Sequence, residues 1–149
     1  VYDPVRQEEF IASRGRGAQL NGHRIRVGDR HELTESLIGT GVPFLGHCDE
    51  HLDWYTQSLA AVTGRSMGVR RAGAASLDLA YVAAGRLDGF WEMGLNQWDI
   101  AAGALLVREA GGLITDLSGG EGWYDSGNIV CANGKLMRQI LPLIKWSAA

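Results

Sequence analysis

The stretch that decides the fold is AASLDLAYVAAGRLDGFWEMGLNQWDIAAGALLVREAGGLITD, residues 74–116. Apolar residues at helical spacing predict a helix over 74–84, which a glycine ends. A short apolar strand over 87–92 follows, and a polar loop leads to a second helix over 98–110, which two glycines end. A further strand is expected over 113–116. Strands that alternate with helices of this size predict an α/β fold built in layers.

The same alternation continues on both sides of this stretch. Asn21-Gly22 joins two short extended runs and predicts a tight antiparallel hairpin, because both turn residues tolerate positive φ. No internal repeat or linker divides the chain, which is therefore expected to be one domain or a piece of a larger one. The other expected elements are strands over 36–40, 66–71 and 129–132 and helices over 49–63 and 135–144.

Composition excludes several classes of protein. Hydrophobic residues make up 46% and charged residues 21% of the 149-residue chain, which excludes global disorder. The net charge is −3, whereas a general polyanion binder is clearly basic, so nucleic acid is not an expected partner. No apolar run approaches the roughly 20 residues that cross a bilayer, so no membrane partner is expected. Cys48 and Cys131 are isolated, as is typical of proteins in the reducing cytoplasm.

Acidic residues are concentrated in residues 85–125, and two of them occupy positions where ligands bind. Glu92 ends an expected strand and Asp99 opens the next helix. In α/β folds, ligands sit at the carboxyl ends of strands beside helix N-termini, and Mg²⁺ prefers carboxylate oxygens. The alternatives are a solvated acidic face and, for Asp99, an acid that only complements the helix dipole. Residues 85–125 contain seven acids and only two bases, and the acids are Asp88, Glu92, Asp99, Glu109, Asp116, Glu121 and Asp125.

Several short runs, in order along nearly the whole chain, resemble the inositol monophosphatase family, and the bacterial members most closely. The C-terminal signature is matched by WDIAAG over 98–103 and EAGG over 109–112. The other matching runs are RGRGA over 14–18, LNG over 20–22, RRAGAASLDLA over 70–80 and GFWEMG over 89–94.

The resemblance implies an αβαβα sandwich that forms a homodimer. It also implies a Mg²⁺-dependent phosphomonoesterase, sensitive to lithium, that hydrolyses inositol monophosphate or a similar polyol phosphate. Bound cations would neutralise the phosphate, lower the pKa of the attacking water and stabilise the leaving oxygen.

The resemblance also assigns roles to individual residues. Asp99 matches the catalytic aspartate that binds metal and contacts substrate hydroxyls, and Glu92 matches a glutamate that accepts hydrogen bonds from the substrate ring. Backbone at a helix start lines the pocket in the family. The full set of substrate-binding residues implied in this way is Arg70, Gly73, Ala74, Ala75, Glu92 and Asp99.

One family motif is missing. The Asp-Pro-(Ile/Leu)-Asp-Gly-Thr run, which supplies most metal ligands, has no counterpart, because Asp3-Pro4 is followed by Val5-Arg6. Residues 1–149 are therefore expected to be the C-terminal part of such a domain, without the metal-binding N-terminal half. One carboxylate is a poor site for Mg²⁺, so we expect the chain alone to be inactive.

Alternative functions remain open at this stage. The substrate could instead be a sugar bisphosphate or a phosphorylated nucleotide. A non-catalytic role is a dimerisation or interaction protein linked to RNA metabolism, for which a basic strip near the hairpin is the only support. That strip, called the arginine hairpin below, consists of Arg14, Arg16, Arg24, Arg26 and Arg30.

Two further expectations concern single side chains. His47, Cys48 and His51 could bind a soft metal, but no fourth ligand is obvious nearby and an exposed helix start is the favoured explanation. Trp98 is expected to pack against the helix that begins beside it and so to aim Asp99 into the site.

Overall fold

The computed structural model describes residues 1–43 and 48–144 of the chain. The first part is a four-stranded antiparallel sheet in which neighbouring strands follow one another in sequence. The predicted hairpin turn is confirmed, with φ of 48° at Asn21 and 79° at Gly22. The four strands are β1 (Tyr2–Asp3), β2 (Glu8–Ser13), β3 (Gly17–Leu20) and β4 (His23–Ile25).

The second sheet is mixed and has the order β6-β5-β7-β9-β8. β5 pairs with β6 and with β7 in parallel, whereas β9 runs antiparallel to both of its neighbours. The parallel strands β5 and β7 therefore bring their carboxyl ends to one edge of the sheet. The five strands are β5 (Leu37–Thr40), β6 (Gly68–Arg70), β7 (Gly89–Glu92), β8 (Leu113–Thr115) and β9 (Ile129–Ala132).

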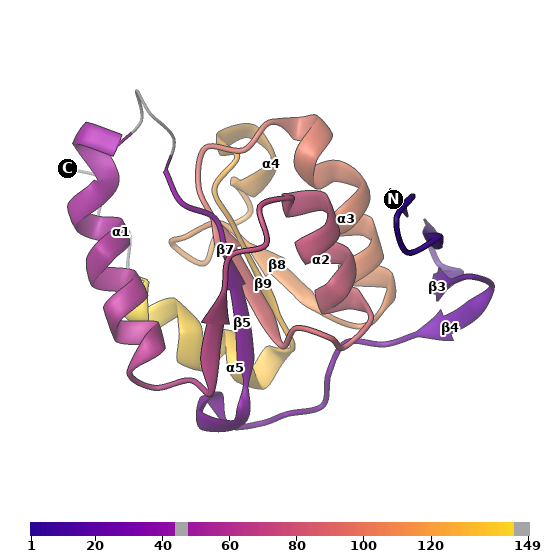
Figure 1. Cartoon of the computed structure of the whole chain (residues 1–149), viewed down its shortest axis with the longest axis horizontal. Helices are drawn as coiled ribbons and strands as arrows, with labels where there is room; N and C mark the ends of the chain where they lie inside the picture. The colour runs from indigo at the N-terminus through magenta and orange to yellow at the C-terminus, as the bar shows by residue number, and fades with distance from the viewer. Residues whose placement is uncertain (44–47, 145–149) are drawn as a thin grey trace.

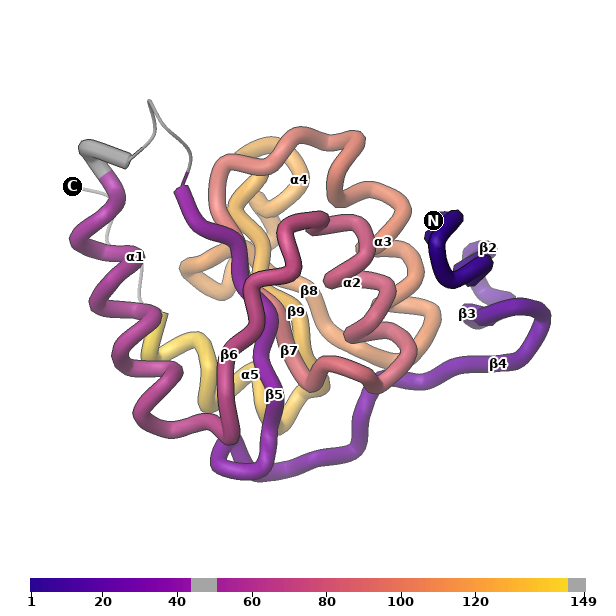
Figure 2. The backbone as a smooth tube through the Cα atoms, in the orientation of Figure 1, coloured from indigo at the N-terminus to yellow at the C-terminus, as the bar shows by residue number. Residues whose placement is uncertain are grey.

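Helices cover both faces of the mixed sheet. Figure 1 shows α1 and α5 on one face, and α2 and α3 between the mixed sheet and the antiparallel one. Figure 2 shows the same arrangement as a backbone tube, and the described residues form four layers: sheet, helices, sheet, helices. The predicted α/β layering is confirmed. The helices are α1 (Cys48–Thr63), α2 (Ala75–Ala83), α3 (Gln97–Glu109), α4 (Trp123–Ser126) and α5 (Gly134–Ile140), with 3-10 turns at Leu33–Glu35 and Leu141–Leu143.

Successive side chains of a strand point to opposite faces of the sheet. Because helices cover both faces of the mixed sheet, the side chains on both faces are buried. On β7, Phe90 packs toward α2 and α3, while Trp91 packs toward α1 and α5. Cys131 and Val130 divide between the same two cores on β9. This two-sided burial fixes the end of β7, and with it the position of Glu92.

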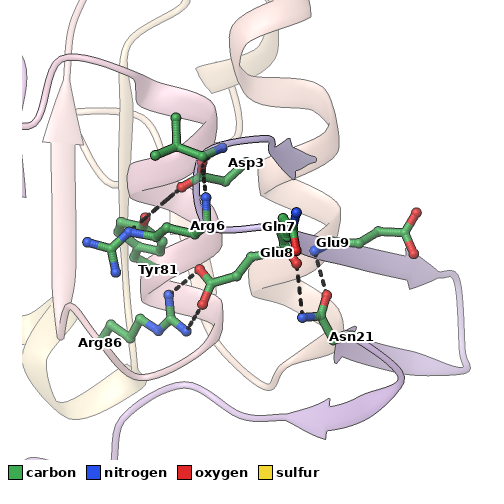
Figure 3. A network of polar contacts seen from close by, with 9 residues as sticks. Asp3, Arg6, Gln7, Glu8, Glu9, Asn21, Tyr81 and Arg86 are labelled. Atoms are coloured by element: carbon green, nitrogen blue, oxygen red, sulfur yellow. Dashed lines mark hydrogen bonds and ion pairs between the residues drawn. The ribbon is translucent and has the colours of Figure 1, made fainter.

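The antiparallel sheet is tied to α2 by a polar network, which Figure 3 shows. Tyr81 on α2 donates to the Asp3 carboxylate at 3.5 Å, and Arg86, just after α2, donates two hydrogen bonds to the Glu8 carboxylate, at 2.7 and 2.8 Å. The Asn21 side chain accepts from the Glu9 N–H at 2.8 Å, which fixes the hairpin turn against β2. The antiparallel sheet is thereby fixed both to α2 and at its own turn.

Two differences from the expected elements have local causes. The last helix ends at Ile140 and continues as a 3-10 turn that contains Pro142, because proline lacks the N–H that helix continuation needs. The short helix α4 was not expected, and Gly127 in the left-handed conformation ends it. Within residues 1–43 and 48–144, no helix has both the length and the hydropathy required for crossing a membrane.

Candidate active site

A cleft of about 220 Å³ lies at the edge of the mixed sheet where β5 and β7 end and α2 and α3 begin. It brings together backbone at a helix start, two carboxylates and a guanidinium. Five of the six predicted substrate-binding residues line it. The lining residues are Gly41, Arg71, Gly73, Ala74, Ala75, Ser76, Glu92, Leu95 and Asp99.

A larger hollow of about 450 Å³ lies elsewhere, between the turn at Leu33, the end of α1 and the C-terminal turn. No carboxylate lines it, and its walls are mostly apolar. Its size therefore does not make it the site of acid–base or metal chemistry, and the smaller cleft is the candidate.

Asp99 sits in the first turn of α3. Its Oδ2 accepts a hydrogen bond from the N–H of Asn96, the N-cap residue, at 3.0 Å. Such a contact satisfies an N–H group at the helix start and holds the carboxylate in place. Within the described part of the chain, Oδ1 accepts no hydrogen bond, so one oxygen is left for a ligand.

The expectation that Trp98 packs against the helix and aims Asp99 is wrong. Its side chain is 80% exposed. Trp98 occupies the outer face of the first helical turn, and the Asn96 backbone holds Asp99 instead. The sequence placed a large aromatic beside the acid, but adjacent helix positions point in different directions.

Glu92 is the last residue of β7 and is half-buried in the cleft. Burial raises the pKa of its carboxyl to about 7, and nearby Asp78 raises that pKa further, while Arg71 opposes the shift. A Cβ at Gly41, directly after β5, would overlap the Glu92 carboxylate, so a side chain there would displace that carboxylate from its present position. The cleft thus holds a carboxylate whose charge state changes near neutral pH.

Asp78 lies behind the cleft on α2 and is 1% exposed. Its Oδ1 has no hydrogen-bond partner among the described residues. Burial raises the pKa of this carboxyl to about 6, and Arg71 counteracts part of that shift. The charged form of Asp78 is therefore destabilising in the folded protein at neutral pH.

Replacing Asp78 by asparagine is expected to stabilise the chain at pH 8 by about 2 kcal/mol, since each pKa unit corresponds to about 1.4 kcal/mol. The folded-state pKa exceeds the ordinary value of 3.8, so folding stability falls as pH rises through about 6. The gain should vanish below pH 4, where both states are protonated. Urea unfolding at several pH values measures it.

Asp88 provides the matched comparison for Asp78. It is also buried, but it accepts a hydrogen bond from the Leu37 N–H at 2.8 Å and lies 3.4 Å from Arg30 Nε. Asp88→Asn should therefore destabilise at pH 8. A loss of stability in Asp78→Asn as well would contradict the cause given for its raised pKa.

Arg70 and Arg71 are adjacent in sequence but occupy different positions relative to the cleft. Arg70, the residue assigned by resemblance, does not line the cleft, and its Nη1 donates to its own neighbour, the Val69 carbonyl, at 3.0 Å. Arg71 lines the cleft instead. Arg70 is the last residue of β6, and the chain leaves the strand after it, which brings Arg71 to the cleft.

The start of α2 forms the cleft wall that the resemblance assigns to Gly73, Ala74 and Ala75. Gly73 has a φ of +96°, and the N-cap residue Ala74 provides no side-chain hydrogen bond to the helix. First-turn N–H groups have no partner within a helix, so an uncapped start can donate them to an acceptor in the cleft.

The structure bears on two further expectations, the soft-metal site at His47, Cys48 and His51 and the arginine hairpin. His47 and the side chain of Cys48 lie outside the described residues, and His51 is on α1. Among the side chains that the structure describes, those of residues 1–43 and 51–144, no group of three His, Cys, Asp or Glu side chains could hold a metal ion. All five residues of the arginine hairpin are exposed, although Arg26 donates to the Glu109 carbonyl and Arg30 pairs with Asp88.

Gly41, Arg71 and Asp78 were not singled out in the sequence. Gly41 directly follows the strand expected over 36–40, and Asp78 lies in a run of apolar helix residues where a buried acid is unusual. That break in the apolar pattern was the one available signal. Their association with the cleft depends on which strands pair, which local patterns do not determine.

Comparison with known proteins identifies a family and several relatives. The sequence model of the inositol monophosphatase family matches residues 1–147. The protein named Nus factor SuhB from Pseudomonas aeruginosa is 56% identical over 145 residues, which cover 97% of this chain and 54% of that protein. The inositol-1-monophosphatase of Mesorhizobium japonicum is 47% identical, with 97% and 54% covered.

The similarity extends to solved structures. The extragenic suppressor protein suhB from Bartonella henselae superposes with a TM-score of 0.93 at 44% identity, covering 99% of this chain and 55% of that one. The chain spans about half the length of these relatives and matches their C-terminal part.

Proposed function

The chain belongs to the inositol monophosphatase family, and from this premise we propose that it forms the substrate-binding part of a Mg²⁺-dependent phosphomonoesterase. The substrate would be inositol monophosphate or a similar polyol phosphate. The rest of such an enzyme, including most of its metal ligands, would come from a segment equivalent to the half of the relatives that this chain does not span.

The observation that carries the proposal is the makeup of the cleft. Glu92 from β7 and Asp99 from α3 line it together with the uncapped start of α2. Carboxylates accept hydrogen bonds from hydroxyl groups, and helix N-termini donate to anionic oxygens. A molecule that carries hydroxyl groups beside a phosphate matches both kinds of wall.

The described residues do not by themselves fit a complete magnesium site. Mg²⁺ requires near-octahedral oxygen coordination, and no group of three candidate ligands occurs among the described side chains of residues 1–43 and 51–144. We propose Asp99 as one ligand, through the oxygen that accepts no hydrogen bond from the described chain. When bound, the ion would supply phosphate neutralisation and a more acidic water.

The proposal predicts a clear division of activity. The complete protein that contains this chain should hydrolyse inositol monophosphate with Mg²⁺ and lose that activity in EDTA or lithium. The 149-residue chain alone should show little turnover under the same conditions, because it supplies too few metal ligands. Phosphate release measures both. Robust, Mg²⁺-dependent turnover by the chain alone would contradict the proposed division of the site.

Substrate identity and assembly belong to the same proposal. Comparing turnover of inositol monophosphate, a sugar bisphosphate and a phosphorylated nucleotide by the complete protein would separate the possible substrates. We also propose the homodimer that the family implies, which sedimentation of the complete protein would test.

A second candidate function is binding of RNA or of an RNA-associated partner, with a cytoplasmic location. It is favoured by the relatives named Nus factor SuhB and by the exposed side chains of the arginine hairpin. Clustered arginines attract phosphate backbones.

Reversing the charge of Arg14, Arg16 and Arg24 to glutamate should weaken RNA binding by about tenfold or more at 0.1 M salt, because phosphate contacts are lost. Phosphatase activity should persist, since these residues are remote from the cleft lining. Fluorescence anisotropy with a labelled RNA measures the binding. Unchanged affinity in the triple variant would remove this candidate.

A further inference from the structure

Arg71 has no assigned role, yet it is the guanidinium that lines the candidate cleft. The backbone at Gly73 lies close to the Arg71 side chain. A Cβ at Gly73 would lie 2.9 Å from Arg71 Nη1, and the φ of +96° there also favours glycine. Glycine at this position therefore leaves room for the Arg71 side chain beside the start of α2.

Arg71 is also without a direct partner among the described residues. Its guanidinium makes no hydrogen bond and no ion pair there, although Glu92 and Asp99 line the same cleft. Arg86 shows the contrast, because it binds the Glu8 carboxylate through two hydrogen bonds. An arginine with five unused N–H donors in a cleft is available to a ligand.

The charge of Arg71 nevertheless acts on the carboxylates of this region. It lowers the pKa of both Glu92 and Asp78, against the stronger effect of burial. The cleft therefore carries acceptors and an unpaired donor group at the same time. A hydroxyl group can donate one hydrogen bond and accept another, so it can bind both at once.

We propose that Arg71 is a specificity-determining residue whose N–H groups donate to oxygen atoms on the alcohol part of the phosphate ester while Glu92 accepts from its hydroxyls. The inference rests on the proposed phosphatase function and deepens it. It assigns the cleft to polyol phosphates rather than to phosphate esters in general. A phosphate ester without ring hydroxyls would leave Arg71 unused.

The experiment compares Arg71→Gln, Arg71→Lys and the control Arg138→Gln, which changes an exposed arginine on α5, in the complete protein. With inositol monophosphate, Arg71→Gln should raise KM about tenfold with kcat nearly unchanged, because a charged donor to the substrate is lost equally in the ground state and the transition state. Arg71→Lys should recover part of the loss. Arg138→Gln removes the same charge outside the cleft lining and should match the parent. With phenyl phosphate, the KM effect of Arg71→Gln should be much smaller.

Calorimetric binding of inositol monophosphate to the parent and to Arg71→Gln gives a readout that needs no turnover, and a weaker Kd in the variant is expected. Equal KM and Kd in parent and Arg71→Gln would overturn the inference, as would equal losses with both substrates. An equal effect of Arg138→Gln would show that only net charge matters and would overturn it too. Absence of phosphatase activity in the parent would instead count against the proposed function, and the calorimetric comparison would still decide the role of Arg71.

Discussion

Asparagine at position 99 is expected to lower phosphatase turnover of the complete protein by about a hundredfold to a thousandfold, the range seen when one group that stabilises transition-state charge is removed. The proposal makes Asp99 both a Mg²⁺ ligand and a contact for substrate hydroxyls. A neutral amide keeps the size of the carboxylate but loses its charge. Steady-state assays with inositol monophosphate at saturating Mg²⁺ measure the loss.

Asparagine separates the chemistry of Asp99 from its structural contact. The Asn96 N–H donates to Asp99 Oδ2, and an amide oxygen can accept the same hydrogen bond. Asp99→Asn should therefore unfold near the parent midpoint, whereas Asp99→Ala should cost about 1 kcal/mol of stability, as lost helix caps do. Asp125→Asn changes an exposed acid on α4 and is the matched control. Parental turnover by Asp99→Asn would remove the basis of the proposed function.

The elements around the cleft could be predicted from sequence because local signals mark their ends. Helices expected over 74–84 and 98–110 occur as α2 (Ala75–Ala83) and α3 (Gln97–Glu109). Glycines stop both helices, and the apolar strand between them is too short for another helix. The family resemblance, confirmed over residues 1–147, then placed Glu92 and Asp99 at those ends.

The side chains that complete the cleft could not be predicted, because they depend on the direction in which single residues point. Adjacent arginines at the end of β6 are equivalent in composition, and only the end of the strand at Arg70 sends Arg71 to the cleft. The prediction that Trp98 packs against its helix is wrong for the same reason, because it depends on the direction of one helix side chain. The contact of Gly41 with Glu92 depends on β5 lying beside β7, a pairing that is distant in sequence.

Gly127→Ala is expected to have the largest effect on stability, about 3 kcal/mol or more, since a left-handed residue with a Cβ costs 1–2 kcal/mol and overpacking adds 1–3. Gly127 has a φ of +70°, and a Cβ there would overlap the backbone of Leu95. The Leu95 N–H donates to the Gly127 carbonyl at 3.0 Å, so the two segments cannot easily separate. Urea unfolding of the chain measures the loss.

The Gly127→Ala substitution should also disturb the geometry of the cleft. Leu95 lines it, and the next residue, Asn96, holds Asp99 through its N–H. Displacing Leu95 should therefore lower turnover of the complete protein as well as stability. Gly111→Ala is the matched control, because its φ is +91° but no atom lies within 4 Å of the added Cβ. It should lose only the backbone cost, about 1 kcal/mol, and keep its activity. If both alanine variants lost equal stability, the backbone conformation alone would explain Gly127, and its contact with Leu95 would have no part in positioning the cleft.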